Sequence, residues 1–349
     1  MSIRTILICT SQTPLVRFGG TQSLVNSLHR ALLNRGFTVD VVSIPFRHYP
    51  KEEILKSHLI WRLLDLTESE GQKIDMVIAT KFPSYLVQHP NKVTWLIQQF
   101  RQAYDWVGTE LSSFAGTTED TRLLSAIRRL DTLALSESKR LFAISGNVAG
   151  RLARNNHLQA VPLHPPPQHE GLYRNDGYGD YILSPSRLNR LKRVHLLIEA
   201  MAQCKSRARC LIVGEGPAEE ELKRLVRRRR LGERISFVGG VADQQLLELY
   251  AGCFSVYFAP YDEDYGLVTI EAFKSQKPVL TASDSGGVLE FVKHRHNGYI
   301  TSAGTPKELA EAIDRLYDDR DLCRELGQAG HETVKDITWD RTIDQLVGS

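Results

Sequence analysis

Residues 261–272, YDEDYGLVTIEA, set two carboxylates eight positions apart across a glycine. The preceding run, 254–260, is mainly apolar and aromatic and ends in proline, which predicts a buried strand. Residues 267–276 have the composition of a helix that ends before a second proline. We therefore expect Glu263 in the loop between strand and helix, and Glu271 one turn inside the helix.

Backbone amides at a helix start lack intrahelical partners and carry partial positive charge, so they suit a phosphate. The amides expected at this position are those of Gly266, Leu267 and Val268. With two carboxylates approaching from different sides, the arrangement favours a nucleotide-sugar site. A simpler interpretation treats the acids of 262–264 as solvated groups that the helix dipole favours, and Glu271 as an ordinary surface glutamate.

A second strand-to-helix transition carries two cations. Residues 181–184 are expected to form a strand, and residues 194–203 carry apolar side chains at helical spacing. Arg187 and Lys192 lie between them, at the carboxyl end of a strand, where open α/β sheets bind ligands. A planar guanidinium and a compact ammonium suit a diphosphate and the charge that it gains as a leaving group. A basic loop without a ligand is the alternative.

Both stretches, in this order, resemble the retaining family-4 glycosyltransferases of the two-Rossmann-domain type. Glu263 and Glu271 match the family pattern E-x7-E, and Arg187 and Lys192 match R-x5-K. Each fragment is short, but their joint order along the chain is specific for the superfamily. Further matching fragments are Phe18-Gly19-Gly20, Val213 to Pro217, Phe237 to Val241 and Asp284 to Phe291.

The resemblance implies an α/β protein of GT-B architecture, with two Rossmann-like domains whose parallel sheets face across a cleft. It places Glu271 on the ribose, the backbone around Val241 on the base, and Arg187 and Lys192 on the diphosphate. Glu263 would contact the sugar. The implied activity is hexosyl transfer, with retention, from a UDP- or GDP-sugar to a hydroxyl-bearing acceptor in polysaccharide or glycoconjugate biosynthesis. The acceptor would be a glycan, a lipid-linked or a small molecule.

Glycines in two loops are further candidates for ligand contact. Gly19 and Gly20 lie between the first strand and a helix that Thr21 is expected to cap, where a bare backbone lets a phosphate or sugar come close. Gly214 and Gly216 occupy the equivalent loop of the second half, and this G-x-G is too short for a dinucleotide fingerprint. We assign Gly20 and Gly214 to the donor and Gly19 to the acceptor side. Loop glycines without a ligand are the alternative.

The segment 95–105 resembles the family segment in which a histidine commonly lies near the transferred sugar. Gln98 stands at that position here. Its amide can bind a sugar hydroxyl but cannot carry a proton at neutral pH, which puts a general-base role in doubt. In this family the departing diphosphate can itself assist the incoming hydroxyl. We assign Gln98, Arg101 and Tyr104 to the acceptor or sugar side.

At 349 residues the chain exceeds the usual single core. We expect an amino-terminal acceptor-binding domain over 1–164, a proline-marked linker over 165–179 and a nucleotide-sugar-binding domain over 180–349, with the last helix packing back on the first domain. The predicted strands are 5–9, 38–43, 75–79, 93–97, 140–144, 181–184, 210–213, 235–238, 254–258 and 279–281.

Composition gives the expected location and partners. The hydrophobic content of 42% and charged content of 24% are globular, no apolar run could span a bilayer, and the start is too short for a signal peptide, so we expect a cytoplasmic protein. The five scattered cysteines suggest reduced thiols.

The net charge is +6 up to residue 164 and −3 beyond it. That excess would suit an anionic partner such as the inner face of a membrane, although a solvated surface is the simpler interpretation. The run 227–230 is not expected to bind nucleic acid, because its arginines spread over several helix faces without interleaved aromatic residues.

Neither a metal nor a cofactor is expected. Asp262-Glu263-Asp264 resembles the D-x-D metal motif of the other main glycosyltransferase fold, but the following glycine and Glu271 fit the metal-independent pattern better. The histidines show no ligand spacing. Two alternative functions stay open. One is a nucleotide-sugar 2-epimerase, for which the chain lacks the carboxylate and histidine signature, and the other is a non-catalytic nucleotide-binding partner protein.

Overall fold

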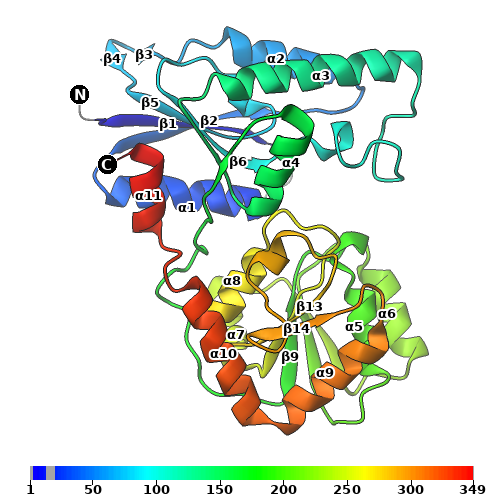
Figure 1. The fold of residues 1–349 in the computed structure, drawn as a ribbon. Coiled ribbons are helices and arrows are strands. Elements are labelled where there is room, and N and C mark those ends of the chain that lie inside the picture. Colours follow the sequence, from blue (N-terminus) through cyan, green and yellow to red (C-terminus); the bar gives the residue numbers. More distant parts are fainter. Residues whose placement is uncertain (1–2, 13–19, 349) are drawn as a thin grey trace. The chain divides into compact units, whose positions relative to one another are not determined.

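The computed structural model describes residues 3–12 and 20–348. The chain divides into two compact units, residues 1–168 with 338–349, and residues 169–337 (Figure 1). The division falls inside the segment 165–179 that the sequence analysis assigned to the linker.

The amino-terminal unit is built on a six-stranded parallel sheet in the order β2-β1-β5-β6-β7-β8. Its central strands are almost continuously apolar, as strands covered on both faces must be. A two-stranded hairpin, β3-β4, lies outside this sheet. The strands are β1 Thr5–Gln12, β2 Thr38–Pro45, β3 Glu68–Ser69, β4 Gln72–Lys73, β5 Met76–Lys81, β6 Lys92–Gln98, β7 Arg140–Ala143 and β8 Val161–Pro162.

Helices with side-chain caps connect these strands. Thr117 accepts a hydrogen bond from the third residue of α3, and Ser145 does the same for α4, which fixes both helix starts. The α-helices of the unit are α1 Gly20–Asn34, α2 Glu53–Leu63, α3 Thr118–Ser136, α4 Gly146–Asn156 and α11 Trp339–Val347, and the short 3₁₀ helices are η1 Ser84–Leu86 and η2 Arg101–Ala103.

The carboxy-terminal unit has a six-stranded parallel sheet in the order β11-β10-β9-β12-β13-β14. Counted within the unit, this is the order 3-2-1-4-5-6 of doubly wound nucleotide-binding folds. From β9 the chain first adds β10 and β11 on one side of that strand, and then adds β12, β13 and β14 on its other side. The strands are β9 Tyr181–Pro185, β10 Arg209–Val213, β11 Ile235–Gly239, β12 Ser255–Tyr257, β13 Val279–Ala282 and β14 Gly298–Thr301.

Helices cover this sheet around a core that includes Leu197, Ile212 and Ile313. Among residues 3–12 and 20–348, no helix combines the length and the apolar character needed to cross a bilayer. The helices are α5 Val194–Met201, α6 Glu219–Arg228, α7 Asp243–Gly252, α8 Leu267–Lys274, α9 Pro306–Asp318 and α10 Arg320–Val334, with 3₁₀ turns η3 Arg190–Lys192 and η4 Gly287–Glu290.

All ten predicted strands are present, whereas the hairpin β3-β4 and the strands β8 and β14 were not predicted and one helix cap was misplaced. The four-residue β14 is too short for a periodic signal and is stabilised by pairing with β13, where a Cβ on Gly298 would lie 2.1 Å from the Val279 carbonyl oxygen. Pro162 lies in β8, where the sheet edge tolerates a residue without an amide hydrogen. Helix α1 begins at Gly20, so Thr21 lies in its first turn and the predicted cap is wrong.

Candidate active site

The candidate site of the carboxy-terminal unit lies at the carboxyl ends of β9 and β12. Strand order reverses between these neighbours, and the loops that follow such strands diverge and leave room for a ligand. Residues 186–193 follow β9 and carry Arg187 and Lys192, while residues 258–266 follow β12 and carry Glu263. The fold therefore brings the two predicted motifs to one edge of the sheet.

Lys192 and Glu263 are in direct contact. The Lys192 ammonium lies 2.5 Å from Glu263 Oε2 and 5.1 Å from the centre of the Phe258 ring. The side chains are 19% and 26% exposed, so the pair remains open to solvent. The Asn189 carboxamide accepts the Lys192 amide hydrogen at 3.1 Å and fixes the turn that presents the lysine. The sequence motifs did not predict this ion pair.

Arg187 is exposed, and within residues 3–12 and 20–348 its guanidinium has no hydrogen-bond or ion-pair partner. Its loop is nevertheless rigid. Leu188 is fully buried, and its amide donates to the Glu215 carbonyl at 2.9 Å. A Cβ on Gly214 would lie 2.2 Å from the Ser186 carbonyl oxygen, and the φ of Gly214 is +113°. Gly214 is thus required for loop packing, and its contact with a donor stays a prediction.

The backbone of Glu263 is held by the loop after β13. Its amide donates to the Ser285 carbonyl at 3.3 Å, and its carbonyl accepts from the Gly287 amide at 2.8 Å. A Cβ on Gly287 would lie 2.6 Å from the Asp264 carbonyl oxygen, so only glycine permits this approach. The Asp284 to Phe291 fragment that matched the family therefore positions a predicted catalytic residue.

Arg193 ties the same loops together and was missed by the sequence analysis. Its guanidinium forms two hydrogen bonds to the Asp284 carboxylate, at 2.8 and 2.6 Å. It also donates to the carbonyls of Ala259 and Pro260, at 2.7 and 2.9 Å. The side chain of Arg193, from the loop after β9, is thus hydrogen-bonded to the loops after β12 and β13. No sequence signal distinguishes this arginine from an ordinary basic neighbour of Lys192.

Helix α8 starts as predicted. Gly266 precedes it with a φ of +94°, and a Cβ there would lie 2.8 Å from a methyl group of Val288. The amides of Leu267 and Val268 occupy the first turn, where no intrahelical acceptor exists. Val241 follows β11 at the same sheet edge and is half-buried.

Glu271 lies one turn inside α8 and is not an exposed surface glutamate. The Tyr250 hydroxyl donates to its Oε2 at 2.6 Å, and the Tyr173 hydroxyl hydrogen-bonds with the same carboxylate. The two phenol rings meet edge to face with centroids 6.2 Å apart. Burial raises the pKa of Glu271, while the two phenolic hydrogen bonds oppose that rise.

The predicted acceptor-side residues of the amino-terminal unit differ in accessibility. Gln98 ends β6 and is half-buried. Tyr104 is only 6% exposed and donates to the buried Asp131 at 2.8 Å, so its hydroxyl is already engaged within the unit, and its assignment to the acceptor side stays a prediction. Arg101 is also 6% exposed, and its guanidinium lies 4.6 Å from the centre of the Trp106 ring. Gly20 is exposed at the start of α1, and Gly19 lies outside the described residues.

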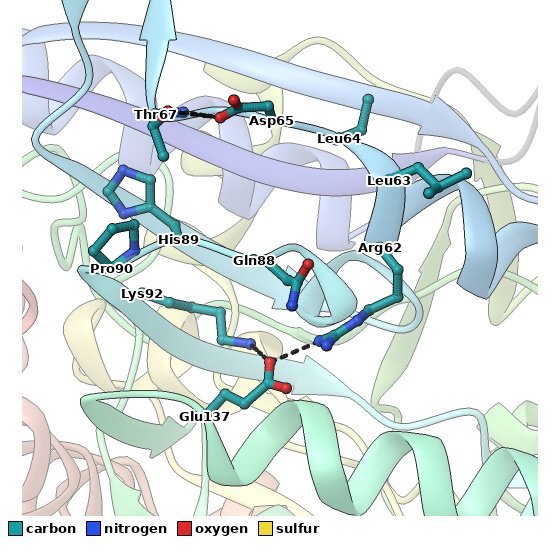
Figure 2. Close-up of a pocket in the computed structure, with 10 residues that line it drawn as sticks. All are labelled: Arg62, Leu63, Leu64, Asp65, Thr67, Gln88, His89, Pro90, Lys92 and Glu137. Carbon is teal, nitrogen blue, oxygen red and sulfur yellow. Dashed lines mark hydrogen bonds and ion pairs between the residues drawn. The ribbon is translucent and has the colours of Figure 1, made fainter.

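A pocket of about 480 Å³ lies elsewhere in this unit, near Lys92 at the opposite end of β6 from Gln98. Figure 2 shows Arg62 and Lys92 turned toward Glu137. Glu137 accepts from Arg62 at 2.7 Å and from Lys92 at 3.2 Å, so the pocket offers a ligand little unpaired charge. None of the predicted site residues lines it.

Across residues 3–12 and 20–348, no three His, Cys, Asp or Glu side chains gather as metal ligands would.

Comparison with known proteins supplies independent evidence on fold and family. Residues 173–333 match the family described as glycosyl transferases group 1. The human alpha-1,3/1,6-mannosyltransferase ALG2 is 32% identical over 171 residues, which are 44% of this chain and 41% of that protein. The chain spans less than two thirds of the length of such curated relatives.

Solved structures resemble the chain over nearly its whole length. Sucrose-phosphate synthase from Thermosynechococcus elongatus has a TM-score of 0.76 at 20% identity, covering 98% of this chain and 97% of its own. Anabaena Alr3699/HepE in complex with UDP and glucose has a TM-score of 0.71 at 18% identity, covering 98% of both chains. The chain therefore has the GT-B fold, with two Rossmann-like α/β domains.

Proposed function

We propose that this protein is a retaining glycosyltransferase that moves a sugar from a UDP- or GDP-sugar to a hydroxyl-bearing acceptor. The observation that carries the proposal is the contact of Lys192 with Glu263, with Arg187 on the same loop as Lys192, at the point where strand order reverses in the carboxy-terminal sheet. That unit coincides closely with the segment that matches glycosyl transferases group 1. A relative in fold, HepE, is known in complex with UDP and glucose, which supports a nucleotide-sugar donor.

The chemistry follows from charge. Arg187 and Lys192 bind the diphosphate and stabilise the negative charge that it gains when the bond between the anomeric carbon and its oxygen breaks. The electron pair of that bond leaves with the nucleoside diphosphate. The acceptor hydroxyl oxygen then bonds to the anomeric carbon from the same face, and its proton passes to a diphosphate oxygen. Gln98 takes no proton in this scheme, in keeping with its amide chemistry.

The two carboxylates have different partners and therefore different roles. Glu263 already contacts Lys192, so an incoming diphosphate competes with it for the ammonium and leaves the carboxylate beside the developing positive charge of the sugar. Glu271 is held by Tyr250 at 2.6 Å and binds the ribose hydroxyls. No metal is required, because Arg187 and Lys192 supply the positive charge for the phosphates.

The test begins with a thermal-shift panel of UDP-, GDP-, ADP- and TDP-sugars on the full chain. A true donor at 100 times its dissociation constant should stabilise the protein by about 2.7 kcal/mol. Nucleotide release is then measured with and without glycan or lipid-linked acceptors, before and after EDTA. Transfer that survives EDTA supports the proposal. Epimerised donor without acceptor would identify a 2-epimerase, and nucleotide-sugar binding without any turnover would identify a non-catalytic partner protein. Loss of transfer activity with EDTA, restored by Mg²⁺ or Mn²⁺, would make the site metal-dependent.

A further inference from the structure

Lys81 and Gln98 lie side by side at the carboxyl edge of the amino-terminal sheet. Strand β5 lies between β1 and β6, and β1 pairs with β2 on its other side. Strand order therefore reverses between β1 and β5, which makes their carboxyl ends the ligand-binding edge of this unit. Lys81 is the last residue of β5 and Gln98 the last of β6, and the two are register partners. The register between β5 and β6 shifts between Ala79 and Lys81, and the pairing beyond this shift sets Lys81 directly beside Gln98.

The ammonium of Lys81 is half-buried and unpaired. Within residues 3–12 and 20–348 it makes no hydrogen bond, ion pair or cation-π contact, and the carboxamide of Gln98 has no hydrogen-bond partner there either. Lys92, at the other end of β6, is by contrast buried but donates to three carbonyl oxygens and contacts Glu137. A partly buried charge without such partners is costly for the folded state.

No carboxylate compensates this charge. Burial lowers the pKa of Lys81, and in the described part of the chain no acidic group opposes that change. Residues 1–2, 13–19 and 349 contain no aspartate or glutamate, so they bring no acidic side chain to this edge. The missing counter-ion is therefore expected to come from a ligand.

The turn after Lys81 is held rigidly, so the lysine is presented at a fixed position. Ser84 is fully buried, and its hydroxyl lies 2.8 Å from the Lys81 carbonyl oxygen and 2.9 Å from that of Cys9. Phe82, which follows Lys81, stacks on Phe100 with centroids 5.0 Å apart. The Phe82 amide donates to the Gln98 carbonyl at 3.2 Å, which ties the ends of β5 and β6 together.

We propose that Lys81 and Gln98 form an anion-binding subsite for the acceptor, which would carry a phosphate or carboxylate group near the hydroxyl that receives the sugar. The lysine supplies a compact charge and the carboxamide a second N–H donor for the anionic oxygens. The inference rests on the proposed glycosyltransferase function and extends it by naming the chemical class of acceptor.

A labelling experiment tests the subsite without knowledge of the natural acceptor. The full chain is treated with acetic anhydride at constant ionic strength, and the acetylation rate of Lys81 is followed by peptide mass spectrometry with glycerol 3-phosphate, acetate or glycerol added. We expect the phosphate or carboxylate probe to slow acetylation of Lys81 several-fold, and glycerol to leave it unchanged. The exposed Lys73 of the same unit is the internal control.

The variants Gln98→Ala and Gln98→Glu sharpen the test. Loss of the amide donor should weaken the protection, and a carboxylate beside Lys81 should abolish it by taking the place of the probe. Equal rates with all three additives, or equal slowing at Lys73, would overturn the inference.

Kinetics separates this inference from the proposed function. With an anionic acceptor, Lys81→Met should raise the acceptor KM roughly ten- to hundredfold, the usual effect of losing a charged hydrogen bond. The donor KM and the release of nucleotide without acceptor should stay unchanged, and the melting temperature should not fall, because an unpaired half-buried charge is removed. A lower melting temperature or a changed donor KM would refute the acceptor assignment. If no nucleotide-sugar binds, the proposed function fails while the labelling result still decides the anion site.

Discussion

At the residue scale, Arg187 and Arg190 offer a matched pair. Both belong to the loop after β9 and both are exposed, but Arg190 pairs with Glu221 at the surface, 3.6 Å away. We predict that Arg187→Ala lowers kcat by about two orders of magnitude, since one preorganised contact to the leaving group is worth about 3 kcal/mol of barrier. Arg190→Ala should change kcat little. Steady-state kinetics with the identified donor measures both variants. An equal loss of kcat in the two would show that Arg187 makes no special contact with the leaving diphosphate.

Substitutions of Glu271 and Glu263 should change the steady-state kinetics in different ways. If Glu271 binds the ribose as proposed, equally in ground and transition states, Glu271→Gln should raise the donor KM more than it lowers kcat. Glu263 lies beside Lys192. If it acts, as proposed, on charge that develops as the anomeric bond breaks, Glu263→Gln should lower kcat with a smaller change in KM. The measurement is kinetics at saturating acceptor. A silent Glu263→Gln, or identical behaviour of the two variants, would contradict this division of roles.

Tyr250 should act through Glu271 and leave a signature in the pH profile. Its hydroxyl donates to the carboxylate and lowers a pKa that burial has raised. Tyr250→Phe should therefore raise the pKa of Glu271 further, and the acidic limb of kcat/KM for the donor should move to higher pH. Tyr181→Phe is the control, because the Tyr181 hydroxyl donates to the Leu249 carbonyl instead. A pH limb that does not move would leave Tyr250 a purely structural residue.

At the scale of elements, a buried lysine anchors the segment before β9 to the start of β13. Lys277 is fully buried, and its ammonium lies 2.5 Å from both Asn175 Oδ1 and the Gly177 carbonyl oxygen. It also lies 4.4 Å from the centre of the Tyr178 ring. Burial lowers the pKa of Lys277 to about 8.

This lowered pKa predicts a pH dependence of stability. Between about pH 8 and 10.5 the unfolded chain keeps the Lys277 proton while the folded chain has lost it, so the free energy of unfolding should rise with pH, by at most about 3 kcal/mol. The rise should vanish in Lys277→Met and persist in the control Lys307→Met, which changes an exposed lysine. Urea unfolding at pH 7 and pH 10 measures it. A difference between wild type and Lys277→Met that stays constant with pH would disprove the assignment.

At the scale of the whole molecule, the last helix belongs to the first unit. Trp339 of α11 meets Trp95 edge to face with centroids 6.3 Å apart, and the Arg140 guanidinium donates to the carbonyls of Gln345 and Leu346. Ile343 and Leu346 are buried. The chain therefore completes its amino-terminal unit only after the carboxy-terminal unit has been synthesised.

Removal of residues 338–349 should destabilise the amino-terminal unit selectively. Losing the burial of Ile343 and Leu346, and exposing the apolar surface that they cover, costs roughly 3 to 6 kcal/mol, so β1 and α1 should lose protection from hydrogen exchange while β9 to β13 keep theirs. Arg35→Ala, which removes exposed ion pairs to Asp340 and Asp344 and an exposed hydrogen bond to the Asp340 carbonyl, should have a small effect. Unchanged exchange in β1 after truncation, measured by mass spectrometry, would show that α11 does not support the unit.

The sequence alone predicted the alternating strands and helices, the position of Glu271 one turn inside α8, and the placing of Arg187, Lys192 and Glu263 on loops at strand ends. These follow from local rules, because apolar periodicity, prolines and glycines act within a few residues of the chain. It did not predict β14, which is too short to be recognised without its partner β13, or the burial of Tyr104, which depends on contacts with distant helices.

Only the tertiary structure decided which distant side chains meet. The Lys192–Glu263 pair, the phenol of Tyr250 on Glu271, the bonds of Arg193 to Asp284 and the neighbouring positions of Lys81 and Gln98 all join residues 17 to 91 positions apart. Such contacts depend on strand order and register, and these are set by the burial of whole sheets beneath their helices. A local pattern fixes which face of a strand is apolar, but it carries no information on which strand will lie beside it.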